Sequence, residues 1–184
     1  MKKRTLFIGT IALLFLILIG GGVWVNSNMG ETTVEGALAK ARRPSRRVMY
    51  QENVNGGVVV FTRKGTGSAT IFGADYVKKS LLGYKWVWGG GFSGYSGQYF
   101  RQISGTPFPM LFGDICNRQV KEVKLTDSEH KISKNAEIVG NGDDRIWFTF
   151  IKTSDGPVFK IDKLSGTGQV LETKGIDVSK SPTF

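Results

Sequence analysis

The first candidate for chemistry is residues 85–100, KWVWGGGFSGYSGQYF, where Gly89, Gly91 and Gly94 have the spacing G-x-G-x-x-G. In dinucleotide-binding proteins this spacing follows a strand and opens a helix whose N-terminus meets the pyrophosphate. A strand is expected before Gly89, but the following residues are too rich in glycine and aromatic side chains for a first helical turn. No parallel strand–helix–strand unit surrounds the glycines. The sequence therefore predicts neither a nucleotide site nor any other cofactor.

The aromatic side chains of this stretch have two interpretations. In the first, they are structural: Trp86 and Trp88 share one face of the last strand of a sheet, and the later rings cover a seam between two modules. In the second, a loop presents the rings to sugar faces or to lipid, as aromatic side chains can do. Large rings are mostly buried, which favours the first. The candidate binding residues of the second are Trp86, Trp88, Phe92, Tyr95 and Tyr99.

The chain has one cysteine, Cys116, and one histidine, His130, which limits the nucleophilic and metal sites that it can form. Arg118 is near enough in sequence to lower the pKa of the thiol, but the cysteine motifs of cell-wall transpeptidases and sortases are absent. One cysteine and one histidine exclude most zinc sites. Residues 141–144, NGDD, lack the rest of a calcium-binding loop and read equally well as a hairpin turn. We assign no catalytic residue and no metal, and a non-enzymatic protein is favoured.

The second candidate for binding is a basic run formed by Arg42, Arg43, Arg46 and Arg47. Cations stabilise the C-terminal end of a helix, so the run can be a solvated helix end. Alternatively, it forms a collar that contacts anionic lipid or wall polymer, at about 1 kcal/mol per basic residue near a charged surface. Residues 26–100 hold 10 basic and 4 acidic residues, whereas residues 101–184 hold 12 and 11. The excess positive charge therefore belongs to the first half.

Several local patterns predict the elements that position these residues. Thr32 and Glu35 match a capping box, and an apolar stripe follows up to Ala41, which predicts a helix. Asn55-Gly56 predicts a hairpin, and a second hairpin is expected around residues 82–83. Short apolar runs separated by turn residues fill residues 101–184. Residues 145–151, RIWFTFI, are apolar on both faces, which predicts a central strand.

The N-terminus predicts a membrane anchor. Residues 6–25 carry no charge, and about 20 residues at about 1.5 Å each cross a hydrocarbon core of roughly 30 Å. A cleaved secretory signal is the alternative, but its apolar region is shorter and ends in a small-residue site that is missing here. Lys2, Lys3 and Arg4 favour a cytoplasmic N-terminus and an extracytoplasmic remainder. The four arginines after the segment pull in the opposite direction.

These patterns combine into a predicted α+β fold. It comprises a cytoplasmic stub and transmembrane helix in residues 1–27, a helix with a four-stranded antiparallel sheet in residues 28–100, and a small all-β, sandwich-like module in residues 101–184.

Four features of the chain suggest a resemblance to a known group of proteins: the MKKR-plus-apolar start, the helix-then-strands order at 31–88, and the pieces RIWFTF and IDKLSGTGQV. It resembles small, N-terminally anchored extracytoplasmic proteins of Gram-positive, Bacillus-like bacteria, which implies a location but no active site. We expect a single-pass, non-enzymatic binding or accessory protein of the cell envelope whose partner is anionic lipid, wall polymer or an envelope protein. Nucleic acid is not an expected partner. The alternatives are an envelope enzyme with an unrecognised site and a regulatory domain that acts on another membrane protein.

Overall fold

The computed structural model describes residues 29–43, 46–65, 70–93, 97–127, 129 and 132–180. The predicted transmembrane segment at residues 6–25 lies outside these ranges. Within them, no helix is long and apolar enough to cross a membrane.

The described chain is mostly β, with 58% of it in strands and a single α-helix, so the predicted α+β class is wrong.

Helix α2 spans Val34–Lys40. Sheet A has the order β1 (Arg47–Val54), β2 (Gly57–Lys64), β3 (Ile71–Ser80), β4 (Gly83–Ser93). Sheet B has the order β5 (Gln98–Phe100), β6 (Met110–Asp114), β10 (Ile146–Phe150), β9 (Glu137–Val139). Sheet C has the order β12 (Val170–Asp177), β11 (Val158–Ser165), β7 (Val120–Asp127), β8 (Ile132–Asn135). Three short 3-10 helices are η2 (Gly142–Asp144), η3 (Thr153–Asp155) and η4 (Val178–Lys180).

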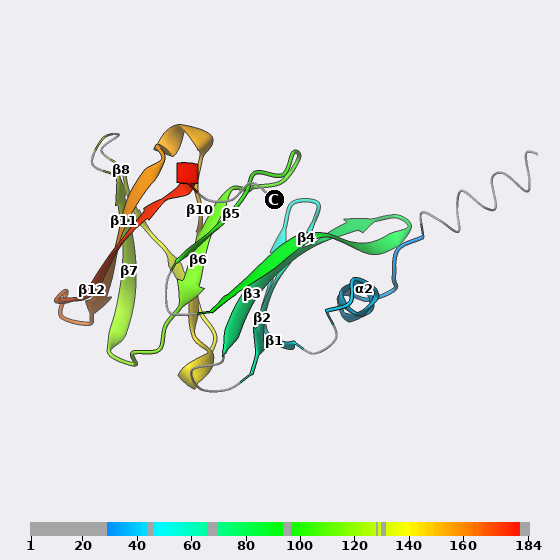
Figure 1. Ribbon diagram of the computed structural model, residues 1–184, viewed down its shortest axis with the longest axis horizontal. Helices are drawn as coiled ribbons and strands as arrows, with labels where there is room; N and C mark the ends of the chain where they lie inside the picture. The colour runs from blue at the N-terminus through cyan, green and yellow to red at the C-terminus, as the bar shows by residue number, and fades with distance from the viewer. Residues whose placement is uncertain are drawn as a thin grey trace, which may run out of the picture.

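The three antiparallel sheets and the helix form successive layers, with sheet B between sheets A and C and α2 on the outer face of sheet A (Figure 1). A ring-rich cluster that includes Phe61 and Phe148 joins sheets A and B. A second cluster around Trp147 joins sheets B and C. A third cluster, of valines and helix side chains, joins α2 to sheet A. The fold is not α+β, because the single helix covers only part of one sheet. All other contacts between layers are between two sheets.

The predicted module boundary after residue 100 falls between β5 and β6, which pair with each other in sheet B. The cluster between sheets A and B contains Val59 and Tyr76 from before that point and Met110 and Phe148 from after it.

Strand β10 has the two apolar faces that its sequence predicts. It pairs with β6 on one side and with β9 on the other. Ile146 and Phe148 face sheet A, and Trp147 faces sheet C. The prediction of a central strand is confirmed because alternation places successive side chains on opposite faces.

Of the two local signals in this region, the predicted turn is confirmed and the predicted helix cap is not. The Asn55-Gly56 hairpin is confirmed: Val54 pairs with Gly57, and Gly56 has a φ of 82°. The predicted capping box at Thr32 is wrong by one residue. The N-cap is Thr33, whose hydroxyl accepts a hydrogen bond from the Gly36 amide at 3.0 Å, so the helix starts at Val34.

Candidate functional site

The aromatic side chains singled out from the sequence lie in three different clusters. Trp86 packs beside α2, whereas Trp88 and Phe92 pack between sheets A and B. Tyr99 packs between sheets B and C, and Tyr95 lies outside the described residues. The structure therefore does not gather the described rings into one surface.

The two tryptophans lie on opposite faces of β4, and the expectation that they share a face is wrong. Trp88 is opposite Tyr76 and Trp86 is opposite Val77, so Val87 is an extra residue between the two pairs. This β-bulge inverts the alternation, because one inserted residue moves all later side chains to the other face. Trp88 lies with its ring centroid 4.3 Å from that of Phe100, in the cluster between sheets A and B.

Trp86 contacts a buried carboxylate, that of Asp75, on the outer face of sheet A. Asp75 is 0% exposed, and one of its oxygens accepts a hydrogen bond from the indole nitrogen of Trp86 at 3.0 Å. Arg43 Nε lies 3.8 Å from that oxygen, and Arg46 Nη1 lies 3.7 Å from the other. The second oxygen of Asp75 has no hydrogen-bond partner among the described residues. Burial outweighs the tryptophan and the two arginines and raises the pKa of Asp75.

The arginines are held in this arrangement by contacts of their own. Arg43 donates a hydrogen bond to the carbonyl of Gly89 at 3.0 Å, and its guanidinium lies 5.3 Å from the centre of the Trp86 ring. Burial lowers the pKa of Arg46, although Asp75 opposes that effect. We call Arg43, Arg46, Asp75 and Trp86 the arginine–aspartate cluster.

The glycines of the KWVWGGGF stretch create the space that this cluster occupies. A Cβ atom on Gly89 would overlap the Asp75 carboxylate, and one on Gly91 would lie 3.0 Å from Arg46 Nη2. On the neighbouring strand, a Cβ on Gly73 would overlap Arg46 Nη1. Gly90, which points to the other face, has no atom within 4 Å of its hypothetical Cβ. The glycines thus serve close packing of charged side chains on a sheet.

The four arginines of the predicted collar are separated by the fold. Arg43 and Arg46 belong to the arginine–aspartate cluster. Arg47 donates to the Asp144 carboxylate at 2.6 Å, an oxygen that also accepts from Arg63 at 2.8 Å. Arg42 is exposed and follows the helix with a φ of 58°. Sequence reasoning missed Asp75, although a single acid inside the small and apolar run IFGADYV was a usable signal.

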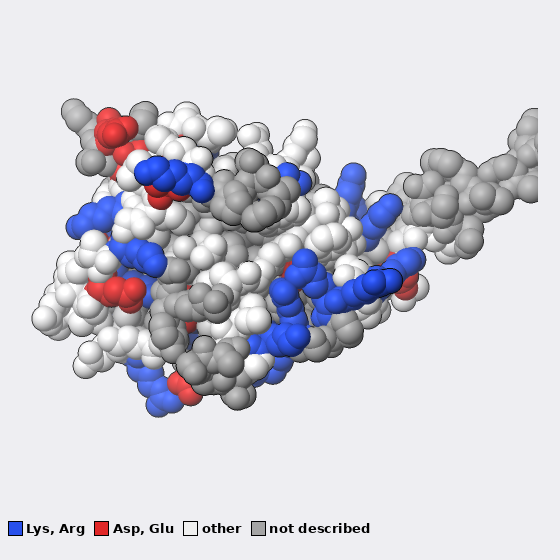
Figure 2. Space-filling view, in the orientation of Figure 1, with Lys and Arg blue, Asp and Glu red and all other residues white. Residues whose placement is uncertain are grey.

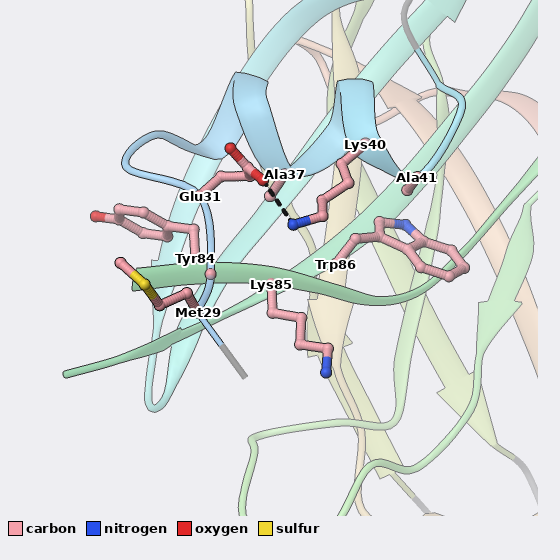
Figure 3. Close-up of a pocket in the computed structure, with 9 residues that line it drawn as sticks. Met29, Glu31, Ala37, Lys40, Ala41, Tyr84, Lys85 and Trp86 are labelled. Carbon is pink, nitrogen blue, oxygen red and sulfur yellow. Dashed lines mark ion pairs between the residues drawn. The ribbon is translucent and has the colours of Figure 1, made fainter. Parts of the chain in front are cut away.

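A groove of about 250 Å³ lies beside the cluster, between α2 and the start of β4. Trp86 lies beneath Ala41 at one end, and Met29 and Tyr84 lie at the other (Figure 3). Lys40 reaches from the helix to Glu31, with 2.9 Å between the charged atoms. The groove therefore has mainly apolar walls and one ion pair, because the ammonium of Lys40 is already bound to Glu31 and the Lys85 side chain points away from the helix (Figure 3).

Cys116 does not have the properties of a nucleophile. Its thiol donates a hydrogen bond to Asp114 at 3.0 Å. Although Cys116 is an exposed residue, desolvation of its sulfur and the adjacent carboxylate raise the pKa of the thiol to about 12. Only the thiolate attacks, so at neutral pH this side chain is a protonated donor. His130 lies outside the described residues.

The acidic side chains near the suggested calcium loop are engaged with arginines. Asp144 binds Arg47 and Arg63, and Asp143 accepts a hydrogen bond from Arg118 at 3.0 Å. In the part of the chain that the structure describes, no three His, Cys, Asp or Glu side chains are grouped closely enough to hold a metal ion.

Comparison of the chain with protein-family models, with curated proteins and with solved structures found no match.

Proposed function

We propose that this protein is a membrane-anchored, non-enzymatic accessory or binding protein of the cell envelope. The N-terminal apolar segment is its anchor, and residues 28–184 are extracytoplasmic. Sheet A and α2 face the membrane, and sheet C is the layer farthest from it.

One observation carries the proposal: the first described residues are fixed to sheet A. The Gly30 amide donates to the carbonyl of Leu82 at 2.7 Å, and Glu31 pairs with Tyr84 through bonds of 2.7 and 2.8 Å. Only residues 26–29 separate this attachment from the end of the apolar segment. Four residues reach at most about 14 Å at about 3.5 Å each. An anchor in the bilayer therefore holds this end of sheet A at the membrane surface.

The charge distribution supports the same orientation. Lysine and arginine side chains gather over α2 and the β3–β4 hairpin, whereas both signs are mixed over sheet C (Figure 2). Basic residues next to a span are attracted to anionic lipid headgroups. Lys40, Arg42 and Lys85 are exposed at this end. Arg43 and Arg46 contribute less, because Asp75 offsets part of their charge.

The non-enzymatic part of the proposal is supported by what the reactive groups do. The thiol of Cys116 is protonated and bonded to Asp114, and Asp75 lies beneath two arginines. Asp75 is 0% exposed and is therefore not presented to a substrate, and the exposed Cys116 carries a protonated thiol rather than a nucleophilic thiolate.

The test is extraction of membranes from cells that express the full chain. Alkaline carbonate should leave the protein in the pellet, and protease added to cells without their wall should digest the folded part. A variant with Leu14→Arg and Leu18→Arg should move to the supernatant, because each arginine at a span centre costs about 2.5–3.5 kcal/mol. The matched control, Leu14→Ala with Leu18→Ala, should stay in the pellet. Release of the unmodified chain by carbonate would refute the proposal.

A further inference from the structure

Exposed apolar side chains are concentrated at one point, the turn between β3 and β4. Leu81 is fully exposed, Leu82 is 40% exposed, and Met29 beside them is 54% exposed. These are three of the six large hydrophobic residues that are exposed in the described part of the chain. The Gly30–Leu82 hydrogen bond holds Met29 next to the turn. In the ribbon view, the hairpin ends beside the first described residues, at the opposite end of the molecule from sheet C (Figure 1).

Basic side chains surround this turn. Lys78, Lys79 and Lys85 are exposed, and residues 78–85, KKSLLGYK, contain no acid. The Lys79 ammonium lies 5.8 Å from the ring centre of Tyr84. The leucines lie at the tip of the turn, and the lysines and the tyrosine lie behind them. This order matches a bilayer surface, in which apolar acyl chains lie beneath the charged headgroups.

We infer that the β3–β4 turn enters the headgroup region of the bilayer, with Leu81 and Leu82 at the acyl boundary and the three lysines among anionic headgroups. This inference rests on the proposed function, since the apolar segment must be in that bilayer. The short attachment carries the argument: Leu82 is bonded to Gly30, which is five residues beyond Val25. The turn is thus held within about 18 Å of the end of the span, at about 3.5 Å per residue.

A lipid surface fits this turn better than a protein partner does. Stable protein interfaces bury about 1,200–2,000 Å² in total and need a broad complementary surface. Two leucines and a methionine on a narrow two-stranded turn do not supply that area. A bilayer requires no complementary shape, and lysines near an anionic surface add to the attraction of a few apolar side chains.

The experiment uses the full chain in vesicles that contain anionic lipid, with an environment-sensitive fluorophore on a single introduced cysteine. Cys116→Ser removes the native thiol. Leu81→Cys places the probe at the turn, and Val170→Cys is the control, because Val170 is 51% exposed on β12 at the far end of the molecule. We expect a blue-shifted emission at position 81 and quenching by spin labels attached to lipid near the headgroup. The probe at position 170 should remain water-exposed and unquenched.

A second variant tests the lysines without changing the apolar turn. Lys78→Gln, Lys79→Gln and Lys85→Gln together should reduce the lipid quenching at position 81, and so should vesicles made only of zwitterionic lipid. Unchanged quenching in both cases would overturn the role of the lysines.

The remaining outcomes separate the two proposals. A water-exposed probe at position 81 in a chain that resists carbonate extraction would overturn the insertion and leave the anchor intact. A blue-shifted probe that lipid-attached labels do not quench would indicate contact with a second protein chain and would also overturn the insertion. Release of the chain by carbonate would overturn the anchor itself.

Discussion

Sheets A and B are both covered on two faces, but they are covered by different chemistry. Sheet B lies between two sheets, and both of its faces bury apolar side chains such as Phe148 and Trp147. The outer face of sheet A buries valines under α2 and then a carboxylate, Asp75, under two arginines. The difference concerns only the outer layer, because the inner face of sheet A is as apolar as sheet B.

The length of the covering element explains this difference. A helix of 7 residues covers about 10 Å at about 1.5 Å per residue, whereas a strand of 10 residues extends about 34 Å at about 3.4 Å per residue. Helix α2 therefore reaches only part of β3. Beyond its C-terminal end, Arg43 and Arg46 cover the sheet with their long side chains, and Asp75 offsets their charge. The arginine side chains pack directly on the sheet, and the strands beneath them have room for this only because residues 73, 89 and 91 are glycine.

The largest expected loss of stability is in the apolar layer between sheets B and C. Trp147 is 1% exposed between sheets B and C. Trp147→Ala removes its contacts in a layer that cannot collapse freely, so we expect a loss of about 3–5 kcal/mol in the free energy of unfolding. Denaturant titration of the full chain in mild detergent, followed by far-UV circular dichroism, measures it. Val170→Ala, at an exposed position, should change stability by less than about 0.5 kcal/mol. Equal effects of the two substitutions would remove the distinction between buried layer and surface.

A smaller effect is expected where glycine makes room for the arginine–aspartate cluster. Gly89→Ala forces the new methyl group against the Asp75 carboxylate, and overpacking of this kind costs about 1–3 kcal/mol. Gly90→Ala is the matched control on the adjacent residue, because its Cβ would meet open space. Its effect should stay within about 0.5 kcal/mol. If the two variants unfold at the same denaturant concentration, the glycines are not there to admit the charged side chains.

The smallest effect is a pH dependence of opposite sign in two aspartates. Burial raises the pKa of Asp75 in the folded state, so its contribution to stability is largest in acid and falls as the pH rises through the folded-state pKa. Arg47 and Arg63 lower the pKa of Asp144, so its contribution is present above the unfolded-state pKa and is lost in acid.

Asp75→Asn should therefore be more destabilising at about pH 3 than at about pH 7, and Asp144→Asn should be more destabilising at about pH 7. The difference for Asp144 should be about 1 kcal/mol, the scale of a partly exposed ion pair, and the difference for the buried Asp75 should have the opposite sign. Thermal unfolding of both variants beside the unmodified chain at the two pH values measures it. A parallel response of the two variants would contradict the different environments assigned to the two carboxylates.

The local patterns of the sequence determined the elements that depend on neighbouring residues. Alternation in RIWFTFI predicted a strand with two buried faces, and Asn55-Gly56 predicted a hairpin, because both signals are complete within a few residues. The apolar stripe of the helix was correct, whereas its first residue was not, since two adjacent threonines compete for the N-cap position.

The tertiary structure alone decided which layers meet and which charges pair. No local pattern relates Arg46 to Asp75, which is 29 positions further along the chain, or states that one extra residue at Val87 turns Trp86 and Trp88 to opposite faces. The α+β prediction failed for the same reason: a helix and many strands were visible in the sequence, but the stacking of three sheets was not. Stacking depends on contacts between distant residues. A period of two or of 3.6 reports only which side of an element is apolar, and it does not report what will cover that side.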